Sequence, residues 1–312
     1  MKEKVKIQLS TRERKFRWFY ASLVILPLLQ FAVFYGYVNF NSFKLAFWSY
    51  GLNELATSFE YTFAGLDNFK EAFSILSSSP YLIENSVYYF LISAFIGLSL
   101  SLAFSFYIYK GYFLSKFFKV ILFLPNVISG IIFSFLFKYV VTDVYKEIVF
   151  MISGETVLGL LDNIDTRLAT VYFYNIWVSF GIYMLMFSGA MSGISDEIVE
   201  ACELDGANLV QEFWYITVPM IFPTFSSLFV IAMTGIFGNQ LSLHSLYQGD
   251  KGVSFGTIGY YIFFHSANLV NFEVTKPTMS ELSALGLILS FIMVPLTLIV
   301  RRLLEKFGPK ES

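Results

Sequence analysis

The sequence predicts an all-α integral membrane protein with six transmembrane helices. Of its 312 residues, 56% are hydrophobic and only 14% are charged, and the mean hydropathy is +0.64. A soluble chain of this length carries about a quarter charged residues to cover its surface. Six apolar runs are each long enough for a helix to cross about 30 Å of hydrocarbon, which takes about 20 residues. None alternates strictly between lipid-facing and lumen-facing residues, so barrel strands are not expected.

The first run, 19–38, follows a basic N-terminus, 1–18, which holds seven Lys and Arg residues. This arrangement is like that of a signal peptide. The apolar stretch is too long for one, however, and no small-residue cleavage site follows, so we expect a retained transmembrane helix. Residues 39–85 form a connection in which 61–79 is polar enough for a loop or a surface helix.

The other five runs make up a core, residues 86–300. The expected transmembrane helices are 86–109, 120–141, 168–191, 216–238 and 281–300. Segment 192–215 joins the fourth and fifth helices of the whole chain, and 301–312 is a tail. Longer connections, 39–85, 142–167 and 239–280, lie on the opposite side of the membrane.

The distribution of basic residues predicts the orientation. The side that holds both termini and the segment after 86–109 carries 14 Lys and Arg residues, and the other side carries seven. Cytoplasmic loops are the ones enriched in Lys and Arg. We therefore expect both termini and segment 192–215 in the cytoplasm, with 39–85 outside.

Composition also excludes several classes of function. The net charge of −2 argues against a nucleic-acid partner. A single cysteine, Cys202, excludes an intramolecular disulfide and a multi-cysteine metal site. His244 and His265 have no other ligand type near them in the sequence, so we expect packed or solvated histidines and no metal. The runs lack the embedded ionisable groups of a secondary transporter and the side-chain constellation of an intramembrane enzyme.

The most informative segment lies between the fourth and fifth helices. It contains six carboxylates and no Lys or Arg: Asp196, Glu197, Glu200, Glu203, Asp205 and Glu212. Charges are expensive in lipid, and an anionic cytoplasmic leaflet would repel an acidic segment resting on it. We therefore expect it to be solvated or docked on a partner.

Its local pattern predicts two short helices joined at a glycine. Asp196, Glu200 and Glu203 are spaced to share one helix face. Gly206 then ends or bends that helix, and an apolar stripe begins beyond it. Pro219 suits the first turn of the next membrane helix.

This pattern resembles the EAA loop of bacterial ABC-importer permeases. The matching residues are Glu200-Ala201-Cys202, Gly206, Ile216 and Pro219, and the string Glu200-Ala201-Cys202-Glu203-Leu204-Asp205-Gly206-Ala207 is similar to the version found in carbohydrate permeases. The resemblance covers residues 85–309. Cys202 replaces an alanine and Val218 a leucine of the family pattern. Residues 248–252 depart from the outer loop of the family, which weakens any inference about the substrate.

The resemblance implies a type I ABC-importer permease fold whose EAA loop is a cytoplasmic coupling helix. The residues that it assigns to ATPase coupling are Glu200, Ala201, Cys202, Asp205, Gly206, Ala207 and Pro219. The sequence has no G-x-x-x-x-G-K-[ST] phosphate loop, so the chain is non-catalytic and binds no cofactor, and ATP and Mg²⁺ bind to partner chains.

The implied partners are a second homologous permease, two cytoplasmic ABC ATPase subunits and an extracytoplasmic solute-binding protein. The implied location is the bacterial cytoplasmic membrane. The implied cargo is a sugar, with an oligosaccharide favoured by the EAA subtype. Another small solute, such as a glycerol phosphate or a polyol, is the alternative, and a secondary transporter is a more remote one.

Polar and aromatic groups in the runs are the candidates for a substrate path. We expect that path at Asn126, Asn175, Trp177, Asn239 and Gln240, with Ser226, Ser227 and Thr234 as further polar positions. Each has a structural alternative. A Ser or Thr hydroxyl can bond its own helix, an Asn can bond a neighbouring helix, and Trp177 can serve helix packing.

Overall fold

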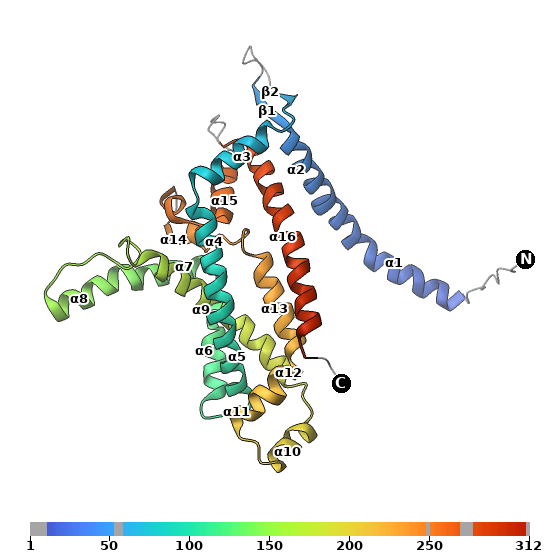
Figure 1. The fold of residues 1–312 in the computed structure, drawn as a ribbon, viewed down its shortest axis with the longest axis vertical. Helices are drawn as coiled ribbons and strands as arrows, with labels where there is room; N and C mark the ends of the chain where they lie inside the picture. The colour runs from blue at the N-terminus through green and yellow to red at the C-terminus, as the bar shows by residue number, and fades with distance from the viewer. Residues whose placement is uncertain (1–10, 53–58, 248–249, 269–276, 310–312) are drawn as a thin grey trace, which may run out of the picture. The chain divides into compact units, whose positions relative to one another are not determined.

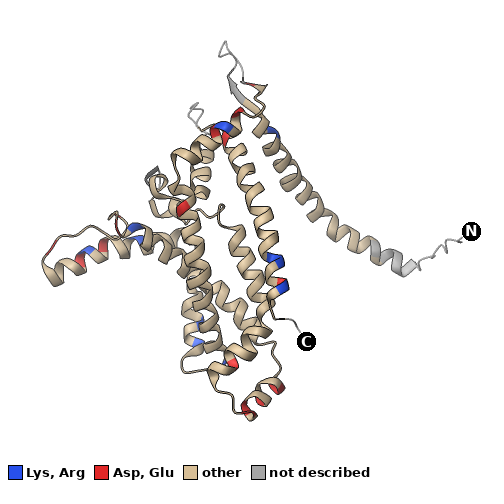
Figure 2. Cartoon of the chain, in the orientation of Figure 1, with Lys and Arg blue, Asp and Glu red and all other residues tan. Residues whose placement is uncertain are grey.

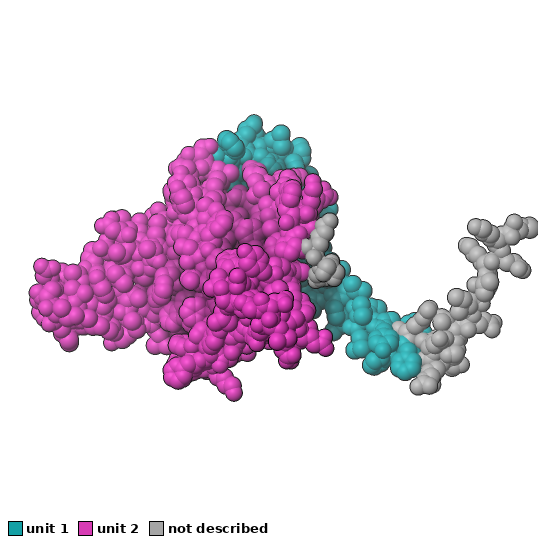
Figure 3. Space-filling view, turned by 60° about the horizontal axis from the view of Figure 1, so that its bottom comes forward, with its two compact units in different colours: residues 1–73, 274–287 teal, residues 74–273, 288–312 magenta. Residues whose placement is uncertain are grey.

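The computed structural model describes residues 11–52, 59–247, 250–268 and 277–309. The chain divides into two compact units, residues 1–73 with 274–287 and residues 74–273 with 288–312 (Figure 3). The described part holds four helices long and apolar enough to cross a membrane, or up to six if each of two bent helix pairs is one span.

The first unit begins with one long helix, formed by α1 (Thr11–Phe31), a π-helical segment η1 (Ala32–Tyr37) and α2 (Val38–Phe47) (Figure 1). Its apolar stretch, Trp18–Phe47, is 30 residues long and extends beyond the expected 19–38. Side chains along it are exposed throughout 18–40, as expected of a helix whose surroundings are lipid.

Residues 39–85 contain strands, which the all-α prediction missed. β1 (Trp48–Leu52) pairs antiparallel with β2 (Phe59–Phe63), with Trp48 opposite Phe63. The rings of that pair stack edge to face at 5.5 Å between centroids, a pairing that stabilises a small sheet. α3 (Asp67–Ser78) follows as a helix in the stretch where a loop or surface helix was expected.

The second unit is built around α9 (Arg167–Met191), which occupies the run expected at 168–191. It packs on a continuous helix made of α4 (Tyr81–Ile92), the π-helical η2 (Ser93–Gly97) and α5 (Leu98–Tyr109). It also packs closely on α6 (Ser115–Val127), because a Cβ at Gly181 would lie 2.5 Å from the Leu122 carbonyl oxygen. Only glycine permits that crossing.

Two expected helices are bent pairs instead of single straight spans. The run 120–141 breaks after α6, and α7 (Gly130–Tyr139) leaves at 106°. The run 216–238 breaks at Ile221, where α13 (Phe222–Thr234) leaves at 69° from the helix before it. Pro219 therefore lies before the bend, and Pro223 occupies the first turn of α13. The expectation that Pro219 opens the membrane helix is wrong, because a second proline four residues on takes that position.

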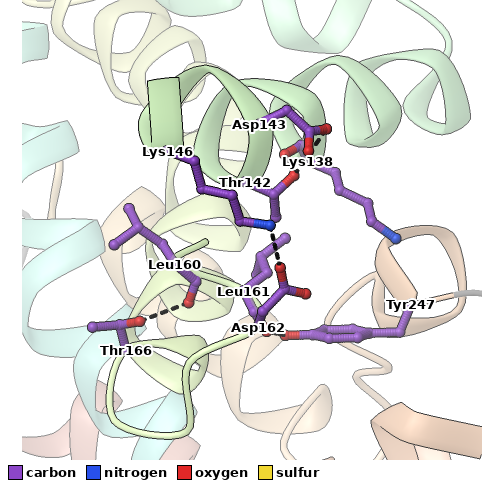
Figure 4. A network of polar contacts seen from close by, with 9 residues as sticks. All are labelled: Lys138, Thr142, Asp143, Lys146, Leu160, Leu161, Asp162, Thr166 and Tyr247. Atoms are coloured by element: carbon purple, nitrogen blue, oxygen red, sulfur yellow. Dashed lines mark hydrogen bonds and ion pairs between the residues drawn. The ribbon is translucent and has the colours of Figure 1, made fainter. Parts of the chain in front are cut away.

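Beyond α7 the helix continues through η3 (Val140–Val144), which is π-helical, into α8 (Tyr145–Ser153). The returning segment is tied to this arm by several contacts (Figure 4). Lys146 Nζ lies 3.1 Å from Asp162 Oδ2, and the Leu160 N–H donates to the Val141 carbonyl at 2.9 Å. The Tyr247 hydroxyl, from α14 (Leu243–Tyr247), donates to the Leu161 carbonyl at 2.8 Å.

The remaining elements complete the second unit. η5 (Asp250–Phe255) is a 3₁₀ turn, and α15 (Ile258–Asn268) follows it. Asn85 holds this region to α4, because its buried amide donates to the Phe255 carbonyl at 2.7 Å. α16 (Met279–Phe307) has residues in both units, and it begins with Thr278 and Glu281 exchanging backbone-to-side-chain hydrogen bonds. Such a reciprocal pair satisfies free N–H groups at a helix start.

Candidate functional site

The acidic segment folds as two short helices joined at Gly206. α10 (Asp196–Leu204) ends in a Schellman motif, in which the Gly206 N–H donates to the Glu203 carbonyl at 3.0 Å and the Ala207 N–H to the Cys202 carbonyl at 3.2 Å. Gly206 has φ +78°, which is the left-handed conformation that this motif requires and that glycine adopts without steric penalty. The predicted glycine joint is thus present in the structure.

The second helix starts at a capping box. Asn208 accepts from the Gln211 N–H at 3.0 Å, and Gln211 Oε1 accepts from the Asn208 N–H at 2.8 Å. α11 (Leu209–Glu212) then runs through the π-helical η4 (Phe213–Thr217) into α12 (Val218–Met220). These caps fix both ends of the turn, so that the two helices are held at a defined angle. We call residues 195–212 the acidic loop.

The acidic loop presents most of its functional candidates outward. Glu200, Ala201, Asp205 and Gly206 are exposed, and Leu204 at the apex is 88% exposed. Cys202 is 8% exposed, so it packs against its own chain and Ala201 is the more accessible of the two. The concave side of the loop encloses a hollow of about 590 Å³. A partner protein can bind to a hollow of this kind.

One carboxylate of the loop is not available to a partner. Glu212 is 3% exposed, and its Oε1 lies 2.6 Å from Nζ of Lys110, the residue that follows α5. The same amine lies 3.8 Å from Glu203 Oε1. Burial lowers the pKa of Lys110, but the hydrogen bond and charge of Glu212 and the charge of Glu203 outweigh it, so the pKa is raised above its ordinary value. Lys110 is therefore charged at neutral pH.

Figure 2 shows the acidic residues gathered on α10 and the basic ones of this end on other elements. The absence of Lys and Arg from the segment is visible in the sequence. Its countercharge, Lys110, is not, because that residue lies far from the loop in the sequence.

Three of the expected path residues hold helices together. Asn126 donates to the Val178 carbonyl of α9 at 3.1 Å, and Asn175 donates to the Leu241 carbonyl at 2.8 Å. Trp177 packs on Phe133, with ring centroids 5.2 Å apart. These are the packing and hydrogen-bonding contacts given above as the alternatives to a role in the substrate path. Ser227 and Thr234 bond carbonyls of their own helix at 2.8 and 2.7 Å.

Asn239 is the expected path residue that reaches a cavity. Its Oδ1 also accepts from the Leu241 N–H at 2.8 Å, which fixes the turn after α13. Gln240 is half-buried beside it but does not line the cavity, and Ser226 lines a separate groove near Arg301. The structure therefore does not bring the expected path residues together.

The cavity lies where α4, α9 and α13 converge and has a volume of about 110 Å³. Five of its lining side chains carry a hydroxyl or an amide: Tyr89, Ser93, Ser179, Tyr183 and Asn239. Tyr89 is 6% exposed, and it lines the cavity together with Ser93, Ser179 and Asn239. No charged side chain lines it. It offers uncharged donors and acceptors together with aromatic faces.

Four of these five residues were missed by sequence reasoning, although a signal was present. Tyr89 and Ser93 are four residues apart, and so are Ser179 and Tyr183. Residues four apart share one helix face. Two hydroxyl-bearing pairs at this spacing, in separate apolar runs, mark two faces that can meet across a polar cavity.

Comparison with known proteins identifies the family of the chain. The family model described as "Binding-protein-dependent transport system inner membrane component" matches residues 93–312. The chain belongs to this family. It is therefore a multi-pass inner-membrane permease component of a binding-protein-dependent ABC transport system, and it is not the catalytic subunit. The resemblance drawn from the EAA pattern is confirmed.

Several relatives match over most of their length. The chain is 26% identical over 287 residues to the probable ABC transporter permease protein YurN of Bacillus subtilis, covering 88% of this chain and 92% of the relative. It is 22% identical over 294 residues to the multiple sugar-binding transport system permease protein MsmF of Streptococcus mutans, covering 93% and 96%. It is 28% identical over 242 residues to the arabinooligosaccharides transport system permease protein AraP of Halalkalibacterium halodurans, covering 75% and 73%.

A solved structure gives the same fold. A chain of a bacterial ABC transporter involved in the import of the acidic polysaccharide alginate superimposes with a TM-score of 0.76 at 19% identity, covering 95% of this chain and 98% of that one. The predicted ABC-importer permease fold is confirmed by this match, with the hairpin β1–β2 as an addition to the expected helices.

Proposed function

We propose that this chain forms half of the translocation path for a neutral oligosaccharide. The names of MsmF and AraP attach sugars to two relatives. The observation that carries the proposal for this chain is the uncharged polar and aromatic lining of the cavity between α4, α9 and α13, which at about 110 Å³ is one part of a path and not a whole oligosaccharide site. A sugar presents hydroxyl groups along its ring edge and C–H groups on its faces, which call for uncharged hydrogen-bonding partners and an aromatic platform.

The absence of charge in the cavity lining favours a neutral cargo. An anionic cargo, such as a uronate or a sugar phosphate, requires Arg or Lys for recognition away from water. The alginate importer carries an acidic polysaccharide, so the similarity in fold extends to a protein whose cargo differs in charge. A glycerol phosphate is disfavoured for the same reason, and a polyol is the closest alternative.

The acidic loop supports a cytoplasmic ATPase partner. The loop is capped at its turn and exposes Glu200, Ala201 and Leu204, so it offers a rigid and accessible binding surface. We assign it to the cytoplasmic side, together with both chain termini, because it contacts Lys110, which belongs with Lys116 and Lys119 to the side richer in basic residues. The working complex contains a second homologous permease, two ATPase subunits and the solute-binding protein.

Reconstituted uptake tests the proposal. The full importer is reconstituted in proteoliposomes and supplied with its binding protein. Radiolabelled neutral oligosaccharides, uronate oligomers, polyols and glycerol phosphate are then offered one at a time. We expect uptake of a neutral oligosaccharide. Tyr183→Phe and Asn239→Leu should each reduce its uptake by about tenfold, since a buried hydrogen bond to a cargo hydroxyl is lost in each. Trp177→Phe, which changes a packing residue, is the matched control. Uptake of anionic cargo alone, or unchanged uptake in both cavity variants, would refute the proposal.

A further inference from the structure

Glu212 stands apart from the other carboxylates of the acidic loop. Asp196, Glu197, Glu200, Glu203 and Asp205 are exposed, whereas the Glu212 side chain is 4% exposed and the Lys110 side chain 13%. A carboxylate that docks on a partner needs access to it. Glu212 has none, so its charge serves a contact inside the chain.

That contact joins three elements through one amine. Lys110 caps the end of α5, Glu212 ends α11, and Glu203 belongs to α10. The Lys110 amine lies 2.6 Å from Glu212 and 3.8 Å from the exposed Glu203, so Glu212 is its main partner and Glu203 adds a weaker, solvent-screened attraction. The position of Lys110 at the C-terminal end of α5 is also the one that the helix dipole favours for a cation.

An aromatic contact reinforces the same junction. Phe106, one turn before Lys110, meets Phe213, the residue after Glu212, edge to face with ring centroids 5.0 Å apart. Both sit in an apolar cluster with Leu102 and Ile194. A short ion pair shielded by such a cluster is sensitive to distance, because any tilt of the loop away from α5 separates the charges in a medium that screens them little.

The helix that ends at Lys110 also lines the cavity. α4, η2 and α5 run as one span over Tyr81–Tyr109, and this span carries Tyr89 and Ser93. At 1.5 Å per residue, Ser93 lies about 24 Å along the axis from Tyr109. One helix therefore connects the junction with the loop to the proposed cargo site.

We propose that the Lys110–Glu212 pair is a latch that transmits movement of the acidic loop to the cavity-lining helix α4–α5. Lys110 is a positioning residue, because it touches neither cargo nor nucleotide. A loop pulled by its ATPase partner carries α5 with it while the pair is closed. Without the pair, the loop moves and the helix lags. The inference rests on the proposed function for the docking of the ATPase on the acidic loop and for the identity of the cargo.

The test separates this role from ordinary stabilisation. Lys110→Met alone leaves a buried, unpaired carboxylate and should lower stability. The double variant Lys110→Met with Glu212→Met replaces a buried pair by apolar side chains, which proteins often tolerate without loss of stability. Lys110→Arg keeps the charge, and Lys119→Met removes an exposed lysine nearby as the control.

The readout is cargo moved per ATP hydrolysed by the reconstituted full importer, with the melting temperature measured in parallel. We expect the double variant to melt like the wild type and to hydrolyse ATP, yet to move about tenfold less cargo per ATP, a typical size for coupling between sites. Lys110→Arg and Lys119→Met should stay within about twofold of the wild type. Wild-type coupling in the double variant, or loss of ATP hydrolysis and stability together with transport, would overturn the latch.

The latch and the cargo assignment fail in different ways. A wild-type importer that moves none of the glycan panel contradicts the proposed cargo. The same variants are then compared by the stimulation of ATP hydrolysis by the binding protein. In that assay the latch predicts about tenfold weaker stimulation of ATP hydrolysis in the double variant than in the wild type. Equal stimulation in the double variant and the wild type would overturn the latch.

Discussion

Gly206 provides the sharpest test of the acidic loop as a rigid coupling element. Its φ of +78° places it in the left-handed region, and a Cβ built there would meet no heavy atom within 4 Å. Any effect of a larger residue therefore comes from the backbone conformation and not from a clash. An L-residue other than glycine loses about 1–2 kcal/mol in that conformation. A β-branched residue lies at the upper end of the range or above it, whereas asparagine tolerates it best.

These magnitudes predict a graded series. Because 1.4 kcal/mol is a factor of ten in an equilibrium constant, a loss of about 1–2 kcal/mol in Gly206→Ala should shift the equilibrium away from the native loop geometry by about fivefold to thirtyfold. Gly206→Val should shift it by as much or more. The alternative geometry loses the two Schellman bonds from Gly206 and Ala207, so α11 no longer holds its angle to α10. We expect cargo moved per ATP to fall in the order Gly, Asn, Ala, Val.

The assay is coupled transport in proteoliposomes with quantified importer, alongside ATP hydrolysis. Membrane insertion should be unchanged in all variants, because the loop lies outside the expected spans. Gly206→Val with wild-type coupling would refute the reasoning, since the substitution cannot keep both the loop geometry and an unstrained backbone. An equal loss of coupled transport in Gly206→Asn and Gly206→Val would also refute the reasoning. Such a result would show that the site requires the absence of a side chain and not a particular φ.

Three further outcomes follow from the same structure. Glu200→Lys, at an exposed carboxylate, should leave the melting temperature unchanged and weaken ATPase co-purification by about tenfold. Glu155→Lys, at an exposed carboxylate outside the acidic loop, serves as the control for charge reversal. Gly181→Leu should abolish the peak of folded protein on fluorescence-detected gel filtration, because a Cβ there would lie 2.5 Å from a carbonyl oxygen of α6. Gly189→Leu is the control and should keep that peak, because a Cβ there meets nothing within 4 Å. Asn208→Ala removes the capping box and should lower the stability of the loop by about 1 kcal/mol, measured by faster hydrogen exchange in α11.

The parts of the fold that follow from local pattern were predictable from the sequence. Apolar run length placed the helix at Arg167–Met191, and the Gly206 joint followed from a glycine after a helical face. The positions of the helix breaks were harder to predict from the sequence. The bend at Ile221 lies between Pro219 and Pro223, and either proline alone is compatible with a straight start, so composition could not say where the turn occurs.

The cavity and the ion pair depend on contacts that the sequence does not record locally. Asn126 and Asn175 are as polar as Asn239, but packing directs their amides to carbonyls of neighbouring elements. Only the fold determines which polar group is consumed by structure and which is left facing a cavity. For each of these residues the sequence alone is compatible with both roles.

The position of charge then explains why the acidic loop and the cavity are chemically so different. The acidic loop keeps exposed charge where water or a partner can satisfy it, and the one carboxylate that is buried, Glu212, has Lys110 at 2.6 Å. The cavity has no such countercharge, so it can hold only neutral groups without a large desolvation penalty. A helix with a charged residue at its end and uncharged hydroxyls in its middle meets both conditions at once. The span Tyr81–Tyr109, followed by Lys110, is that helix. Changes at its end and in its middle should therefore be separable, with Lys110 affecting coupling and Tyr89 or Ser93 affecting cargo affinity.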